Sequence, residues 1–232
     1  MINKCKLVRD TCSWVFQQSS NVKLNEDKIE ILANKFNYTP FNEFEHHNLT
    51  HNTESDEITL LYLFTLDSLN FCFWPLEGFE YEHLAGSVKT YIEKGGAIDK
   101  LSKITEQELV SEIFSGVNVP LADERARILR EMAGVIINRF HSSITSIIAK
   151  ANNSAVELLN ILTENFPNFQ DHSIYKGHQI HFYKRSQILI GDIYAKFEGK
   201  GLGLFYDIGE LTMFPDYRVP QILNEYGVLL YS

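Results

Sequence analysis

The sequence predicts a mainly α-helical fold in a single domain spanning residues 1–232. Long stretches of the C-terminal half repeat apolar residues at intervals of three and four, the period of an amphipathic helix. Residues that start and stop helices bracket these stretches. With 44% hydrophobic and 12% aromatic residues, a chain of this length can bury a sizeable core.

The first half of the chain gives weaker signals. The polar segment 46–56 is expected to be a loop, and its histidines to lie there without a metal. Residues 57–69 fit either a helix or a buried strand, because apolar periodicity cannot decide between them, and we expect a helix. Aromatic runs on both sides of a Pro/Gly turn predict a small β-hairpin near residues 71–81.

The second half is predicted to be mainly helical. The strongest helix lies between Pro120 and Asn152, and a second starts at a Ser154–Glu157 capping box and stops before Pro167. A third covers roughly residues 180–197. The glycines at 199, 201 and 203 follow this helix instead of preceding one, so they indicate a helix-ending turn in preference to a phosphate-binding loop. A last short helix begins near Pro220.

Two features of these helices suggest chemistry. In the third helix, Lys184, Ile188 and Asp192 form a stripe beside the apolar face; the spacing alone favours a solvated surface, and a cleft is the alternative. Asp216 stands just ahead of the last helix, where the helix field favours an ionised carboxylate. Asp216 is therefore either a helix cap or a carboxylate placed for acid–base work or for stabilising a positive sugar.

Composition excludes several classes of function. The net charge of −9, from 21 basic and 30 acidic residues, lacks the basic footprint of proteins that hold long nucleic acids, so a small ligand is favoured. Charged and polar residues interrupt the longest apolar stretch, 58–74, and we expect no membrane span. The first sixteen residues do not resemble a secretory signal.

The cysteines indicate a reducing compartment. Cys5, Cys12 and Cys72 are an odd set without C-x-x-C spacing, so neither a disulfide framework nor a zinc site is expected. We predict a cytoplasmic protein that needs no metal and no cofactor. The sequence does not determine its oligomeric state.

Three motifs, in order, resemble the queuosine salvage family, whose members are queuosine 5′-phosphate N-glycosylases. They are residues 67–74 (DSLNFCFW), residues 182–188 (FYKRSQI) with Asp192, and residues 213–221 (MFPDYRVPQ). The resemblance is densest from residue 180 onward and weakest before residue 57. It implies a fold related to the helix-hairpin-helix DNA glycosylases, whose sites pair a lysine with an aspartate. The matching residues are Lys184 and Asp216, 32 positions apart.

The implied reaction hydrolyses the N-glycosidic bond of queuosine 5′-monophosphate and releases queuine, a 7-deazaguanine with a cationic arm. Because carbon replaces N7, the leaving base cannot be protonated there, and catalysis must come from stabilising the sugar cation and activating water. The resemblance implies this role for Asp216. Lys184 would hold the phosphate or keep Asp216 ionised.

The remaining expected site residues would bind the substrate. Aromatic side chains would stack on the base, although each also suits a core: Phe71, Trp74, Phe205 and Phe214. Acidic and amide groups would hydrogen-bond the base or its arm: Asp67, Asn70, Asp192 and Asp207. Arg185 and Arg218 would bind the phosphate or form structural ion pairs, and Tyr217 and His47 would complete the pocket.

Two alternatives remain open at this point. The chain could be a non-catalytic queuine- or nucleotide-binding protein in which Asp216 only caps a helix. It could also be a repair enzyme of the DNA-glycosylase type, which would need the basic face that the composition lacks.

Overall fold

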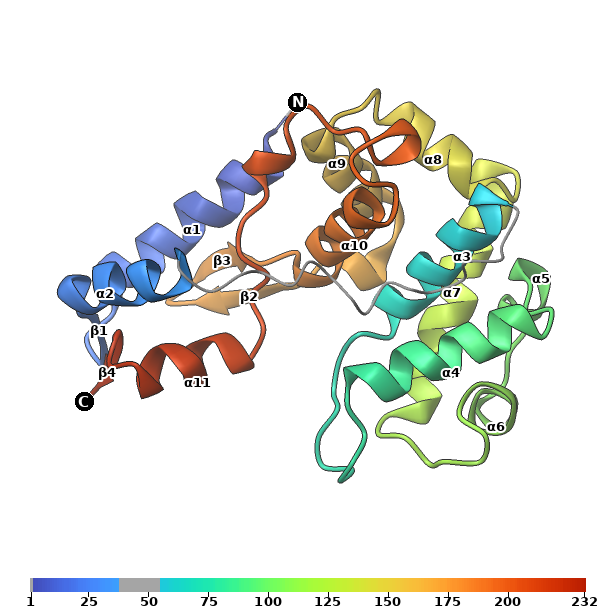
Figure 1. The fold of residues 1–232 in the computed structure, drawn as a ribbon, viewed down its shortest axis with the longest axis horizontal. Coiled ribbons are helices and arrows are strands. Elements are labelled where there is room, and N and C mark those ends of the chain that lie inside the picture. Colours follow the sequence, from blue (N-terminus) through green and yellow to red (C-terminus); the bar gives the residue numbers. More distant parts are fainter. Residues whose placement is uncertain (1, 38–54) are drawn as a thin grey trace.

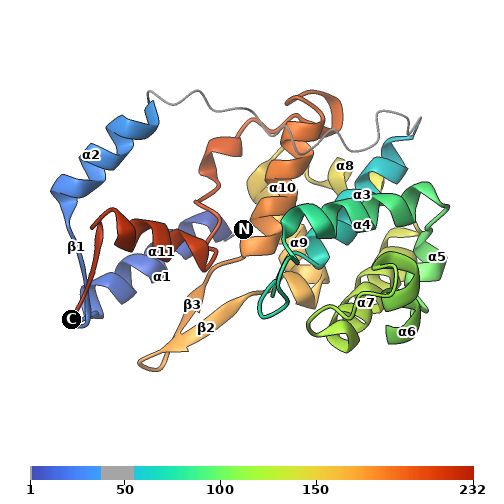
Figure 2. The ribbon, with the colours of Figure 1, turned by 60° about the horizontal axis from the view of Figure 1, so that its bottom comes forward.

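The computed structural model describes residues 2–37 and 55–232, and the predicted site residue His47 lies outside these ranges. The described part is mainly helical, which confirms the predicted fold class. Both views place α10 between two groups of elements: α1, α2 and α11 on one side, and α3 to α8 on the other (Figures 1 and 2). No helix among the described residues is long and apolar enough to cross a membrane.

The described elements follow one another along the chain in the order of their labels. The helices are α1 (Lys4–Gln18), α2 (Glu26–Asn37), α3 (Asp56–Ser68), α4 (Tyr81–Glu93), α5 (Ile98–Leu101), α6 (Glu106–Glu108), α7 (Ala122–Phe140), α8 (Ile144–Lys150), α9 (Ala155–Asn165), α10 (Lys184–Lys196) and α11 (Arg218–Glu225). Two antiparallel pairs complete the fold, β1 (Val22–Leu24) with β4 (Leu229–Tyr231) and β2 (His172–Tyr175) with β3 (His178–His181).

Helix α3 forms the centre of the core. All its residues from Thr59 to Ser68 are buried, and it packs against α4, α7, α8 and α10. A helix buried on every side shows no polar face, which is why its sequence could not be distinguished from a buried strand. The prediction of a helix here is confirmed.

The helix predicted between Pro120 and Asn152 is two helices. His141 and Ser142 adopt left-handed backbone conformations, with φ of 53° and 60°, and end α7. The side chain of Ser143 then accepts the backbone N–H of Ser146 and caps α8. Both helices face the same core, so the regular spacing of apolar residues continues across the turn. The sequence pattern therefore does not reveal where α7 ends and α8 begins.

The hairpin predicted near residues 71–81 is wrong. Residues 71–80, all of them described, contain no strand, and α4 begins at Tyr81. The carbonyls of Phe71 and Cys72 accept hydrogen bonds from Arg125 of α7 instead of a partner strand. The aromatic residues of this segment therefore pack as a loop.

A hairpin that was not predicted occupies residues 172–181, and its last two residues overlap the third predicted helix. Strands β2 and β3 pair from His172 opposite His181 to Tyr175 opposite His178, around Lys176 and Gly177 with positive φ. The third predicted helix consequently starts at Lys184 instead of residue 180. Gly199, with φ of 66°, follows its end, which confirms the helix-ending turn.

Candidate active site

Lys184 and Asp216 meet in an ion pair. The Lys184 Nζ lies 2.7 Å from Asp216 Oδ2, and their side chains are 13% and 26% exposed. Lys184 is the first residue of α10, and Asp216 lies two residues before α11. Two residues that lie far apart in the sequence thus form an ion pair at the point where two helices begin. Both side chains are mostly shielded from water.

Asp216 is stabilised in its ionised form. Its Oδ1 accepts the backbone N–H of Arg218 at 3.0 Å, at the N-terminus of α11. Burial acts to raise the pKa of this carboxyl, but the hydrogen bond from Lys184 and that from the Arg218 backbone outweigh it and lower the pKa below its usual value. At neutral pH the group is a carboxylate.

Lys184 is fixed at both ends. Its backbone N–H donates to both carboxyl oxygens of Asp171, at 2.9 and 3.0 Å, and its Nζ donates to the Asn70 carbonyl at 3.2 Å. Tyr183, just before it, has a left-handed backbone with φ of 54°. The ammonium therefore has two fixed acceptors, one of them charged.

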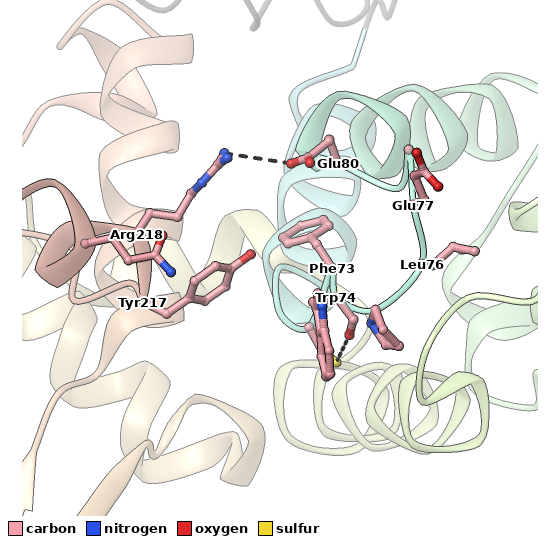
Figure 3. A pocket seen from close by; sticks show the side chains of 11 residues that line it. Phe73, Trp74, Leu76, Glu77, Glu80, Tyr217 and Arg218 are labelled. Carbon is pink, nitrogen blue, oxygen red and sulfur yellow. Dashed lines mark hydrogen bonds and ion pairs between the residues drawn. The ribbon is translucent and has the colours of Figure 1, made fainter. Parts of the chain in front are cut away.

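Two open cavities lie beside the start of α11, and Asp216 lines the smaller one. One, of about 780 Å³, separates the loop 72–80 from the start of α11 (Figure 3). Trp74 and Glu80 line it on one side, and Tyr217 and Arg218 face them from the other. The second, of about 420 Å³, is lined by Asp171, Asp216 and Tyr217, among others. Both volumes fall within the range of small-molecule sites.

Asp67 and Asp192 are two buried carboxyl groups, and Asp67 interacts electrostatically with both Asp192 and Lys184. Asp67 is 0% and Asp192 2% exposed, so the stripe expected from the sequence faces the interior and not solvent. Burial and then the charge of Asp192 raise the pKa of Asp67, and burial raises the pKa of Asp192 to about 7. Burial and these two carboxyls also raise the pKa of the Tyr62 and Tyr81 phenols.

The other residues predicted to bind substrate fall into two groups. Trp74 (79% exposed), Tyr217 (50%) and Arg218 line the larger cavity, and the Arg218 Nη1 lies 3.8 Å from Glu80 Oε2. The ring of Phe214 lies so close to Gly191 that an added Cβ there would stand 2.9 Å from it. The first three side chains therefore line the larger cavity, and Phe214 lies against α10, the helix that begins with Lys184.

The second group has structural partners. Phe205 is 4% exposed and belongs to the core. The carboxylate of Asp207 accepts the Ser154 hydroxyl and the backbone N–H of Ala155 at the start of α9. Arg185 donates to the carbonyls of Ser68 and Asn168, so its guanidinium is directed into the protein.

Two residues of the site were not predicted. Asp171 carries no local pattern that marks it as a partner of Lys184. Arg125 did carry a signal, because it stands three and four positions before Ile128 and Leu129 on the apolar stripe of α7, where a charge needs a buried partner.

These features define a helical protein with an ionised carboxylate, a paired ammonium and open cavities, groups that can serve the hydrolysis of a glycosidic bond. The family model described as "Queuosine salvage protein" matches residues 50–232. The chain belongs to this family.

Named relatives agree with the family match. The chain is 41% identical to a queuosine 5′-phosphate N-glycosylase/hydrolase of Dictyostelium discoideum, over its whole length and 76% of that protein. Proteins with the same name from Sphaerobacter thermophilus and Nematostella vectensis are 38% and 36% identical, over 97% and 100% of this chain and 74% of each relative.

Proposed function

We propose that this protein hydrolyses the N-glycosidic bond of queuosine 5′-monophosphate, releasing queuine and ribose 5-phosphate for queuine salvage into tRNA. The observation that carries the proposal is the Lys184–Asp216 ion pair of 2.7 Å, in which Asp216 lines one cavity and is followed in sequence by Tyr217 and Arg218, which line the other. The names of the relatives support the same reaction. The three free cysteines support a reducing cytoplasm as its location.

Asp216 is the group we assign to the chemistry. Its lowered pKa keeps it ionised, so it can stabilise the positive charge that develops on the sugar as the bond to the base breaks. The same carboxylate can take a proton from the water that attacks C1′. The electron pair of the broken bond leaves with the base, which then gains a proton.

Lys184 serves in this proposal to hold Asp216 and not the phosphate. Its Nζ is mostly buried and already bound to Asp216 and to the Asn70 carbonyl. A Schiff base is not required for simple hydrolysis. Arg218 is the better phosphate ligand, because its side chain is 67% exposed and its ion pair with Glu80 is long, at 3.8 Å.

Trp74 and Tyr217 are proposed to stack on the base. Both are exposed and line opposite sides of the larger cavity (Figure 3). Glu77 and Glu80 line the same cavity, and their carboxylates suit the cationic arm of the base. This assignment leaves Phe205 and Asp207 as structural residues.

The decisive experiment adds queuosine 5′-monophosphate to the protein and detects free queuine by mass spectrometry. Asp216→Asn should reduce turnover by about 10²-fold or more, because the amide keeps the shape and removes the charge. The variant should still fold and bind ligand. Asp10→Asn, which changes an exposed ion pair with Lys6, is the matched control and should be unaffected. Binding without turnover by the wild-type protein would favour a non-catalytic binding protein.

Selectivity gives a second test. The monophosphate should be cleaved well, the nucleoside less efficiently and intact tRNA hardly at all, because an acidic chain of net charge −9 cannot hold an anticodon arm by phosphate contacts. Arg218→Ala should reduce the difference in kcat/KM between nucleotide and nucleoside. Equal efficiency on both by the wild-type protein would contradict the phosphate assignment.

A further inference from the structure

Five consecutive carbonyls, from Ser68 to Cys72, each accept a hydrogen bond from a cationic side chain. Arg185 binds the Ser68 carbonyl at 2.8 Å, and Lys184 binds that of Asn70 at 3.2 Å. Arg125 binds the other three, those of Leu69 at 2.6 Å, Phe71 at 2.5 Å and Cys72 at 2.8 Å. The segment 68–72 connects the end of α3 to the wall of the larger cavity.

Arg125 is committed to this segment. Its side chain is fully buried, and its Nε donates to the Pro120 carbonyl at 2.8 Å. All four hydrogen bonds it donates within the described residues therefore end on backbone carbonyls. Burial lowers its pKa to about 10, so the guanidinium is still charged at neutral pH.

The ring of Phe71 contacts both arginines. The guanidinium of Arg125 lies 4.5 Å from the ring centroid and that of Arg185 lies 5.0 Å from it. The side chain of Asn70 points to Asp67, with Nδ2 3.5 Å from Oδ1. The backbone around Asn70 is thus fixed from several sides.

We propose, on the basis of the function given above, that Arg125 is a positioning residue for Lys184: it fixes the segment 68–72 so that the Asn70 carbonyl holds the Lys184 ammonium against Asp216. An ammonium bound to one acceptor alone can rotate about that contact. A second, immobile acceptor fixes its direction as well as its distance. The planar fork of arginine can hold several carbonyls at once, which lysine cannot.

The first test needs no substrate. Amine acetylation, followed by mass spectrometry of each peptide, measures how well single lysines are protected. In Arg125→Lys the protection of Lys184 should fall at least tenfold, while that of Lys4 stays unchanged. Lys4 is a suitable internal reference because it is also largely buried, at 15% exposed, and donates to Thr163 Oγ1 at 2.6 Å, away from the segment.

Arg130→Lys is the matched control variant. Arg130 lies on the same helix and also donates to a backbone carbonyl, that of Ile104 at 2.6 Å, but it does not contact the segment 68–72. Protection of Lys184 should be unchanged in this variant. Equal loss of protection at Lys184 and Lys4 in Arg125→Lys would indicate general destabilisation and would overturn the proposal.

A double-mutant cycle supplies the kinetic test. Arg125→Lys should lower kcat/KM for queuosine 5′-monophosphate by about 10- to 100-fold, since small misplacements at a reacting centre cost this much. In a Lys184→Met background the same change should cost less than threefold, because the group it positions is gone. Equal losses in both backgrounds would refute the positioning role.

These experiments distinguish failure of the proposed function from failure of the positioning role of Arg125. If the wild-type protein releases no queuine, the proposed function fails, yet the acetylation pattern still decides the role of Arg125. If Arg125→Lys does not fold, Arg185→Lys, which releases the Ser68 carbonyl, takes its place in both tests with the same expectations.

Discussion

The contact between Lys184 and Asp216 sets the protonation state of the site. A carboxyl that is partly buried would normally be harder to ionise, yet here a hydrogen-bonded ammonium and a backbone N–H reverse the direction of the shift. The pair therefore does more than bring two charges together. It keeps the partly buried carboxylate of Asp216 ionised at neutral pH.

Replacing the ammonium should change the pH dependence of activity. In the wild-type protein the pKa of Asp216 lies below its usual value, so the acid limb of kcat/KM should lie below about pH 4. In Lys184→Met burial remains and the opposing hydrogen bond is lost, so the pKa rises and the limb moves to higher pH. A pH–rate profile of both proteins measures this. An unmoved limb in a folded variant would show that Lys184 does not control Asp216.

Gly191 gives a test of Phe214. A Cβ at this position would stand 2.9 Å from the Phe214 ring, so Gly191→Ala must displace the ring. Because Phe214 lies two residues before Asp216, we expect kcat/KM to fall by about tenfold, as small misplacements near a reacting centre do. Gly134→Ala, on α7 where an added Cβ meets nothing within 4 Å, is the control. Unchanged kinetics would show that the position of Phe214 is unimportant.

At the level of elements, the structure depends on contacts between helix ends and distant side chains. Helix α9 is capped by Ser154 and also by Asp207, which lies about fifty positions away in sequence. Helix α10 is capped by Asp171. A carboxylate at each N-terminus accepts hydrogen bonds from free backbone N–H groups, and its negative charge interacts favourably with the helix dipole.

Asp207→Ala distinguishes capping from substrate binding. If the residue caps α9, its loss should lower the free energy of unfolding by about 1–2 kcal/mol while KM stays unchanged. Chemical denaturation and steady-state kinetics measure the two quantities. A large increase in KM with unchanged stability would restore the role in substrate binding that the sequence predicted.

At the level of the whole molecule, two buried carboxyls connect folding stability to pH. The pKa of Asp192 is raised to about 7 by burial, and that of Asp67 is also raised. Between about pH 4 and 7 Asp192 therefore binds more protons in the folded protein than in the unfolded chain, where aspartates titrate near 4, and Asp67 acts in the same direction. The contribution of these two groups to the free energy of unfolding falls as pH rises through this window.

Asp192→Asn should flatten this dependence. One proton taken up on folding corresponds to a slope of at most about 1.4 kcal/mol per pH unit. Urea denaturation at several values between pH 5 and 8 should show a steeper decline for the wild-type protein than for the variant. The exposed substitution Asp10→Asn should leave the slope unchanged. Parallel curves for the wild-type and Asp192→Asn proteins would contradict the raised pKa.

We expect the activity to be independent of metal ions. No cluster of metal-ligating side chains occurs among residues 2–37 and 55–232, and the sequence predicts no requirement. Dialysis against a chelator should leave turnover unchanged. Activity lost on dialysis and restored by a divalent cation would contradict this expectation.

The sequence by itself determined the helical class, the Lys184–Asp216 pairing through its family resemblance, and the start of the last helix beside Asp216. These depend on local period, capping residues and motifs, which are properties of short segments. The single-domain organisation and the helix-hairpin-helix relationship stay predictions.

Only the tertiary structure decided which charges are buried and what they bind. The sequence left Arg185 either at a phosphate or in a structural ion pair, and Asp192 on a stripe that suited a cleft or solvent, whereas the fold turns both inward. It gave no sign of Asp171, and for Arg125 it indicated only a buried charge without naming its partners, because both residues bind backbone groups distant in the chain. Backbone carbonyls and N–H groups are the same in every residue, so their contacts leave no pattern in a sequence and arise only when the chain folds.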